Sequence, residues 1–300
     1  LEPREKTTEL PNYVQPKYDG IGANEYIVTV VHDAVDFISA GDTPLPWELN
    51  IWYHTLNCGF RVSISGETDY PCIFDERVGM ARSYVQMDGK VDFDNFVLRV
   101  KDGANYVSDG RSHLVNFAAN GVEAGKGEGE VRLNRPGKVR VTASTTAYLP
   151  EEQTKAGAMI AEGGLEGRPY WHIEKARIDS SRKVPVELLV NGYPVQRKEI
   201  DADGRWQDLE FSVELKHSSW MALRVLGSSH TNPIYVLVDN RPIRASKRSA
   251  LWCREGVDRC WEMKRSAIRP EEQEAARMAY DIARLTYDRI HDEAVDDTLE

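Results

Sequence analysis

The sequence lacks the features that mark a membrane protein, a disulfide-stapled protein or a nucleic-acid binder. Its 300 residues contain no run of about 18 or more uncharged apolar residues, so no segment is expected to cross a bilayer. Four cysteines are too few for a disulfide scaffold. The 38 basic residues are outnumbered by 48 acidic ones, and the resulting charge of −10 argues against a nucleic-acid backbone as the main partner.

Several motifs are also missing. The first residues, Leu1 to Lys6, contain no apolar stretch of the kind found in signal peptides, and the compartment stays undetermined. The sequence has no C-x-x-C, H-E-x-x-H, P-loop or G-x-S-x-G motif, and the glycines at 125–129 lack the dinucleotide spacing. Cys253 and Cys260 are seven positions apart in a predicted helix, about 10 Å along its axis. A disulfide needs Cα atoms within about 7 Å, so we expect two buried thiols.

The composition that remains is that of a globular protein. Apolar residues make up 41% of the chain, which excludes a disordered polypeptide, and the length favours more than one domain. Changes in pattern divide the chain into residues 1–87, where helix and strand alternate, residues 88–245, which are rich in strands, and residues 246–300, which are helical. The fold class predicted is therefore α+β and multi-domain.

The first region carries the pattern of a β-α-β unit. A strand is predicted at 35–39 and another at 60–64, with a helix between them whose apolar stripe is Leu49, Trp52, Tyr53 and Leu56. The β-branched stretch at 26–31 suits a strand or a helix. We predict a helix, because a strand there would leave too few residues for a parallel crossover.

The second and third regions differ in periodicity. Turn pairs recur from Asp88-Gly89 to Asp203-Gly204 between short alternating runs, which predicts an antiparallel β-sandwich or barrel at 88–245. Two helices are then predicted from their apolar stripes. The first stripe is Cys253, Val257, Cys260 and Trp261; the second, after Pro270, is Ala275, Met278, Ala279, Ile282 and Leu285.

Three carboxylates follow the predicted strands of the β-α-β unit: Asp42 after the first, and Glu67 and Asp69 after the second. Functional groups gather at the carboxyl ends of parallel strands, and carboxylate oxygens bind divalent metals. The three residues are therefore candidates for part of a metal site. Two other interpretations stay open: Asp42 as the N-cap of the following helix, and Glu67 and Asp69 as ordinary turn residues.

The sequence offers few histidine ligands for this candidate metal site. His32 ends a predicted helix, His54 lies off the apolar stripe and is expected at the surface, and His113 leads from a turn into a strand. The remaining histidines, at 172, 217, 230 and 291, form no pair at ligand spacing. The candidate metal site is thus short of nitrogen ligands.

Segments 34–44, 47–59 and 65–72 resemble the last part of a PHP (polymerase and histidinol phosphatase) domain, in the carbaryl-hydrolase-like branch of that superfamily. Residues 229–261 resemble the C-terminal extension of such proteins. The resemblance aligns Asp69 with the aspartate of the final Gly-Ser-Asp-x-His metal motif. Pro71 stands where the superfamily has histidine, and the opening His-x-His motif is not found in the sequence.

The resemblance implies a metal-dependent hydrolase of the ester or phosphoester class, in which Zn, Mn or Fe lowers the pKa of bound water. Asp69 and Asp42 are the expected metal ligands and Glu67 the expected catalytic residue. Residues 1–87 would form the C-terminal part of a PHP-barrel-like α/β domain. The chain would then be the C-terminal portion of a longer metallohydrolase, or a homologue without the first half, and need not hold the metal alone.

The alternative is a non-catalytic binding or assembly module whose β-sandwich recognises carbohydrate or a protein partner. Aromatic residues gathered on one face would favour it, the candidates being Tyr148, Tyr193, Trp206 and Trp220. As a hydrolase, the protein would bind a small-molecule substrate. We expect no nucleic acid and no membrane among its partners, and self-association into a homo-oligomer stays open.

Overall fold

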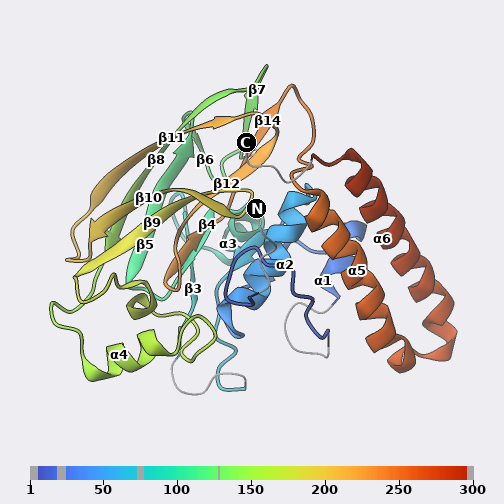
Figure 1. Ribbon diagram of the computed structural model, residues 1–300, viewed down its shortest axis with the longest axis horizontal. Coiled ribbons are helices and arrows are strands. Elements are labelled where there is room, and N and C mark those ends of the chain that lie inside the picture. The colour runs from blue at the N-terminus through green and yellow to red at the C-terminus, as the bar shows by residue number, and fades with distance from the viewer. Residues whose placement is uncertain (1–5, 19–24, 73–77, 128, 296–300) are drawn as a thin grey trace.

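The computed structural model describes residues 6–18, 25–72, 78–127 and 129–295. Within them, three β-sheets combine with helices, and this mixed arrangement confirms the α+β class. The larger sheets lie on one side of the molecule, the two long C-terminal helices on the other, and α2 between them (Figure 1). No helix in the described residues is long and apolar enough to cross a membrane.

The predicted order of helix, strand, helix and strand is confirmed in the first region. Its elements are α1 (Tyr26–Thr29), a 3₁₀ helix (Val30–His32), β1 (Phe37–Ser39), α2 (Leu45–Asn57) and β2 (Ser63–Ser65). The two strands pair in parallel, with Ile38 opposite Ile64. β2 begins later than the alternation predicted, because the N–H of Phe60 still donates to the carbonyl of Thr55 at the end of α2.

Two further sheets hold the remaining strands, and we call them together the two-sheet region. The eight-stranded sheet has the order β10-β9-β12-β13-β4-β3, with β14 beside β12 and β7 beside β14; the four-stranded sheet has the order β11-β8-β5-β6. Their bounds are β3 (Arg82–Val85), β4 (Asn105–Ser108), β5 (Ser112–Ala119), β6 (Val122–Glu123), β7 (Glu130–Leu133), β8 (Gly137–Ala147), β9 (Lys183–Val190), β10 (Tyr193–Asp201), β11 (Gln207–Leu215), β12 (Ser219–Val225), β13 (Ser229–Thr231) and β14 (Ile234–Val238).

The two sheets share one apolar core. Alternate residues of each strand point inward, as a period of two requires, so Val139 and Val141 of β8 meet Leu188 of β9 and Leu223 of β12 in a single buried cluster. Pairing is antiparallel except between β7 and β14. Two helices and one 3₁₀ helix interrupt the strands: α3 (Phe93–Lys101), α4 (Lys155–Glu162) and Ile173–Ala176.

The C-terminal helices are α5 (Lys247–Lys264) and α6 (Gln273–Glu293). Cys253, Val257 and Cys260 of α5 are buried as predicted, and both cysteines are free thiols.

The stripe predicted for α6 is wrong. Met278, Ile282 and Leu285 are exposed, whereas the buried face carries Tyr280, Ala283, Tyr287 and Ile290. The tyrosines take the buried side because their hydroxyls find partners there; that of Tyr287 donates to the carbonyl of Ile27 at 2.8 Å.

A buried polar cluster joins α2 to the eight-stranded sheet. The hydroxyl of Tyr53 lies 2.5 Å from Nε2 of His230 and accepts from Nη1 of Arg224 at 3.2 Å, and Nε of Arg224 pairs with Glu187 at 2.7 Å. Nδ1 of His230 lies 2.7 Å from the carbonyl oxygen of Thr231, so it carries the proton, and Nε2 accepts from Tyr53. We call these residues the joint cluster.

The expected surface position of His54 is wrong. Its ring is fully buried, stacks on Trp252 with centroids 4.2 Å apart, and lies 2.7 Å from the carbonyl oxygen of Asn12 through Nε2. Burial lowers the pKa of His54 to about 4, so the ring is neutral. The prediction failed because α2 is covered on every side, with β12 against one face and α5 against another.

Candidate functional site

The carboxyl ends of β1 and β2 lie side by side and bring their following loops into contact. The N–H of Ala40 donates to the carbonyl of Ser65 at 3.0 Å, which extends the pairing beyond the strands. Gly41 then runs against Glu67, where a Cβ atom would fall 2.0 Å from the Glu67 carbonyl oxygen. A residue with a Cβ atom would clash with the Glu67 backbone, so the absence of a side chain at Gly41 is what allows the two loops to meet.

Glu67 is the residue at the centre of this contact. Its carboxylate accepts the backbone N–H of Gly41, while its Oε1 atom is buried and has no hydrogen-bond partner. Burial raises the pKa of Glu67 to about 7, and repulsion from Asp42 and then Asp69 adds to the effect. The structure therefore brings the three predicted carboxylates within electrostatic reach of one another.

A fourth carboxylate, Glu48, was not among the predicted site residues. It lies in the first turn of α2, is 3% exposed, and accepts the hydroxyl of Thr43 at Oε1. Its Oε2 atom is buried without a partner. Burial raises the pKa of Glu48 to about 8, and Asp42 and Glu67 raise it further by repulsion.

Sequence reasoning missed Glu48 because an acidic residue in the first turn of a helix is ordinarily an exposed partner of the helix dipole. One signal was available. Glu48 precedes Trp52 by four positions, which places it on the apolar stripe of α2 rather than opposite it.

Asp42 and Asp69 stand at the rim of the site. The N-cap position of α2 is occupied by Pro44 and no side chain caps the helix, so Asp42 is not its N-cap. Asp42 instead accepts the hydroxyl of Ser39 at 3.4 Å. Asp69 is exposed and has a left-handed φ of 48°, as a turn residue does. The hydroxyl of the neighbouring Thr68 accepts the N–H of Met80 and fixes this turn.

An aromatic side chain outside the β-α-β unit contacts the loop that follows β1. Trp171, on the segment after α4, donates its indole N–H to the carbonyl of Ala40 at 2.5 Å, so the two-sheet region reaches the strand ends. Trp47, beside Glu48 in the chain, lines a cavity of about 420 Å³ together with Tyr18 and Trp252. None of Asp42, Glu48, Glu67 and Asp69 is among the lining residues, so this cavity is distinct from the carboxylate site.

The potential metal-ligand atoms at the strand ends are all carboxylate oxygens. His54 and His230 are engaged in the core, and among the described residues no three His, Cys, Asp or Glu side chains are arranged to hold a metal ion. One carboxylate oxygen of Glu48 and one of Glu67 nevertheless have no hydrogen-bond partner, and oxygens of this kind are potential ligands for a cation. An oxygen-only donor set suits Mn²⁺ or Mg²⁺ better than Zn²⁺.

The four aromatic residues considered for a binding face do not share one environment. Trp220 is buried and donates to the side chain of Asn57, and the hydroxyl of Tyr193 lies 3.1 Å from that of Tyr13. Trp206 and Tyr148 are exposed, both near one end of the four-stranded sheet. This second pair is the more exposed of the two.

With this geometry established, the chain was compared with known proteins. No model of a protein family, no curated protein and no solved structure matches it.

Proposed function

We propose that the chain supplies the carboxylate part of a divalent-metal centre in a hydrolase of the PHP type, acting on an ester or phosphoester. The observation that carries this proposal is the pair of buried carboxylate oxygens without partners, on Glu48 and Glu67. Buried charges are ordinarily paired or bound to metal, because isolation in a low-dielectric site is costly. A cation held close by, at Asp42 and Asp69, would offset the cost of burying both.

Each residue has a role in this proposal. Asp42 and Asp69 would hold the metal from the rim, with Mn²⁺ or Mg²⁺ favoured over the Zn²⁺ or Fe also expected from the sequence. A bound metal would supply a water of lowered pKa. Glu67, whose pKa is raised to about 7, would accept a proton from that water near neutral pH. Glu48, whose pKa is raised to about 8, accepts the hydroxyl of Thr43 behind the site.

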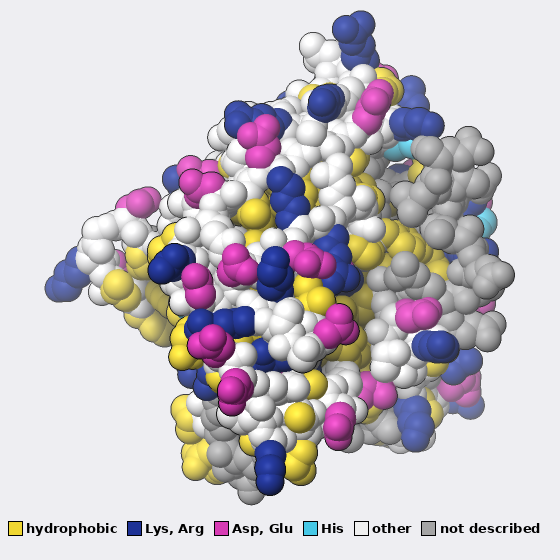
Figure 2. Space-filling view, turned by 60° about the vertical axis from the view of Figure 1, so that its left-hand side comes forward, with side chains coloured by type: hydrophobic (Ala, Val, Ile, Leu, Met, Phe, Trp, Pro, Cys, Tyr) yellow, Lys and Arg dark blue, Asp and Glu magenta, His cyan; other side chains and the backbone are white. Residues whose placement is uncertain are grey.

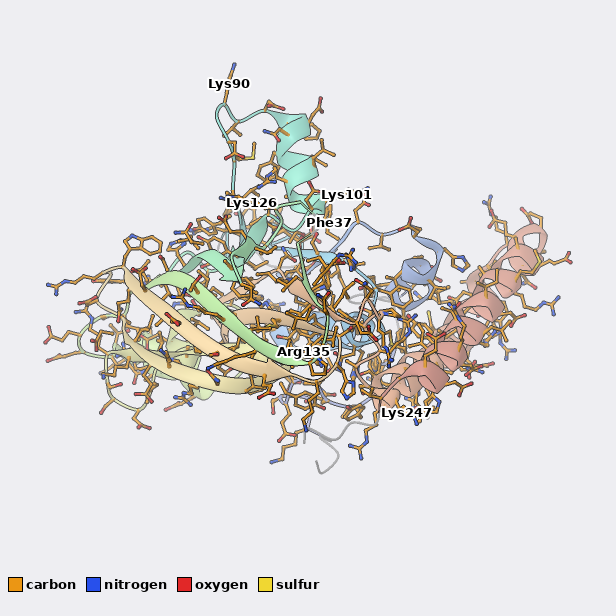
Figure 3. All side chains as sticks on the ribbon, turned by 90° about the horizontal axis from the view of Figure 1, so that it is seen from above. Phe37, Lys90, Lys101, Lys126, Arg135 and Lys247 are labelled. Carbon is orange, nitrogen blue, oxygen red and sulfur yellow. The ribbon has the colours of Figure 1, made fainter. Side chains whose placement is uncertain are left out.

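An exposed surface at the amino ends of β1 and β2 supports the further expectation that another polypeptide completes the α/β domain. Among the described residues β1 pairs only with β2, although parallel sheets are ordinarily covered on both faces. Phe37 of β1 is 44% exposed. Figure 3 shows it at the base of α3, which stands away from the body, and Phe93 on α3 is 78% exposed. A segment packed here would cover the start of β1 and the apolar face of α3.

The test is binding of Mn²⁺ to the purified chain, measured from the electron paramagnetic resonance signal of the free ion. Wild type should bind Mn²⁺ and gain thermal stability from it, while Glu67→Gln should lose most of both effects. Glu210→Gln is the matched control, because Glu210 is exposed and paired with Arg140. Absence of any Mn²⁺ effect on the wild type would contradict the proposal.

A second candidate function is the binding module. It is favoured by the exposure of Trp206 and Tyr148 in the two-sheet region, which we take to be a β-sandwich.

A further inference from the structure

Four rings form a continuous row across the two-sheet region, and we call it the aromatic strip: Tyr84, Tyr106, His113 and Trp206. The rings of Tyr84 and Tyr106 are stacked, 5.2 Å apart and 10° from parallel. His113 meets Tyr84 edge-on at 4.8 Å, and Trp206 lies 6.5 Å beyond His113. Trp206 is 57% exposed and the other three are half-buried, so the row presents an open edge to solvent.

Strand register assembles the strip from both sheets. Tyr84 of β3 lies opposite Tyr106 of β4, and the Tyr106 hydroxyl is 2.7 Å from Nδ1 of His113 on β5. In the four-stranded sheet His113 is opposite Thr146, and Gln207 is opposite Thr145. Trp206, just before β11, therefore falls on the same line across the sheet.

The strip leads into a cavity. Tyr84 and Tyr106 line a space of about 390 Å³ between β4 and β5, together with the exposed side chains of Gln86 and Asn116. Asn116 belongs to a bulge in β5 and has a left-handed φ of 53°. Bulges of this kind turn a side chain away from the regular pleat, here beside the cavity. Aromatic faces and amide groups thus meet at one place.

Two arginines beside the strip have no carboxylate partner among the described residues. Arg82 is exposed and donates to the hydroxyl of Tyr84 at 3.3 Å. Arg111 precedes His113 by two positions in the chain, and its backbone carbonyl accepts a hydrogen bond from the N–H of Tyr148. Arg82 also lies close enough to His113 to lower the pKa of its ring, so this arginine stands beside two half-buried rings of the strip in a chain with a net charge of −10. Carboxylates are the groups that arginine binds best.

We infer that the aromatic strip binds a saccharide that carries carboxylates, such as an oligomer of a uronic acid. The apolar faces of the sugar rings would pack on Trp206 and the tyrosines, the hydroxyls would bond to Gln86 and Asn116, and the carboxylates would pair with Arg82 and Arg111. This site shares no residue with the proposed metal centre, although the backbone of Arg82 packs against Gly66, next to Glu67.

A single-stranded nucleic acid also stacks on aromatic rings, but the surface does not favour it. Binders of that class track the phosphates with a continuous basic groove. On the face shown in Figure 2, basic and acidic side chains are interspersed over the sheets, with apolar patches between them.

The experiment is an isothermal calorimetric titration of the whole chain with a short oligogalacturonate at low salt. We expect binding that weakens as salt rises. Trp206→Ala should weaken it about tenfold, Trp206→Phe should retain most of it, and Arg82→Gln should weaken it several-fold. Arg140→Gln is the control, because Arg140 lies on the same sheet but is paired with Glu210.

Three results would overturn the inference. They are no binding of the oligogalacturonate, equal binding of a neutral galactose oligomer or of an oligothymidylate, and unchanged affinity in Trp206→Ala. Since Trp206 is exposed, its replacement should leave the circular dichroism spectrum and the unfolding temperature as they are, so loss of binding cannot be mistaken for loss of the fold.

Discussion

The joint cluster and the carboxylates at the strand ends are both buried polar groups, yet only one of them is satisfied. In the joint cluster Tyr53, His230, Arg224 and Glu187 bond to one another. At the strand ends one oxygen of Glu48 and one of Glu67 have no partner. A satisfied network makes a unique, rigid contact, whereas an unsatisfied one needs something more. Incompleteness, rather than burial, is what points to a ligand.

The two regions also differ in how they respond to pH. Burial lowers the pKa of His230 to about 3 and raises that of Tyr53 to about 12, so neither changes charge near neutrality. Glu67 and Glu48, at about 7 and about 8, do change charge there. Only the strand ends can therefore couple protons to a ligand under ordinary conditions.

The largest effect is expected from Arg224→Ala. The change leaves Glu187 without its partner in a mostly buried position and should lower the free energy of unfolding by about 3–5 kcal/mol. Urea denaturation measures it. Arg140→Ala, which removes an exposed and solvent-screened pair with Glu210, should lower the stability far less. Equal losses in the two variants would mean that the joint cluster is no better protected than the surface.

A smaller loss is expected from Tyr53→Phe. The variant keeps the ring but removes the hydroxyl that serves both His230 and Arg224, which should cost about 1–3 kcal/mol. The control is Tyr193→Phe, whose hydroxyl makes a half-buried contact with that of Tyr13. If Tyr53→Phe lowers the free energy of unfolding no more than the control does, the Tyr53 hydroxyl does not contribute to the stability of the joint cluster.

The strand ends should show their effect as a pH slope. Raised pKa values mean that the folded state holds protons which the unfolded state has released, so the free energy of unfolding falls as pH rises from about 4.5 to about 8. Below about 4.5 both states are protonated and the stabilisation is complete. In Glu48→Gln one of the two groups is gone, and the slope in thermal unfolding should be about halved.

Added Mn²⁺ should change the pH dependence of stability that arises from the strand-end carboxylates. A cation binds the deprotonated carboxylates, so in its presence the slope of the wild type should shrink or reverse. Arg224→Lys, a change confined to the joint cluster, should leave the slope as it is. A slope unchanged in Glu48→Gln would show that the strand-end carboxylates are not the groups that titrate.

The smallest effect on stability is expected at α3. Phe93 is exposed, so Phe93→Ser should change the free energy of unfolding by no more than about 0.5 kcal/mol. It should nevertheless raise the solubility limit, because it removes a large apolar group from a projecting helix. Light scattering against concentration measures this, and Lys90→Ser at the tip of the same excursion is the control (Figure 3).

Local patterns were enough for much of the fold and for part of the candidate site. The order of elements from Tyr26 to Ser65 followed from apolar spacing and from the length that a parallel crossover requires. The proximity of Asp42, Glu67 and Asp69 followed from the rule that parallel strands end at one edge, and the structure brings these residues together. The buried stripe of α5 followed from its period.

Other features could not be reached in this way. The buried face of α6 was assigned to the wrong stripe, since a helix with two apolar stripes gives no local reason to prefer the one with tyrosines. His54 was placed at the surface, and Glu48 was overlooked. Each error concerned a polar or amphipathic side chain whose surroundings come from residues distant in the sequence.

The sequence by itself determined the order of strands and helices up to Ser65, the place of α5 and which carboxylates follow the strands, because periodicity and turn residues act over a few positions. It did not reveal α3 and α4, which interrupt the strands of the second region. Only the tertiary structure decided which polar groups are satisfied. Glu48 lacks a partner for one oxygen, while His54 gains one from Asn12, a residue 42 positions away. Hydrogen-bond satisfaction and the pKa values that follow from burial depend on contacts made across the whole fold, and no local pattern encodes them.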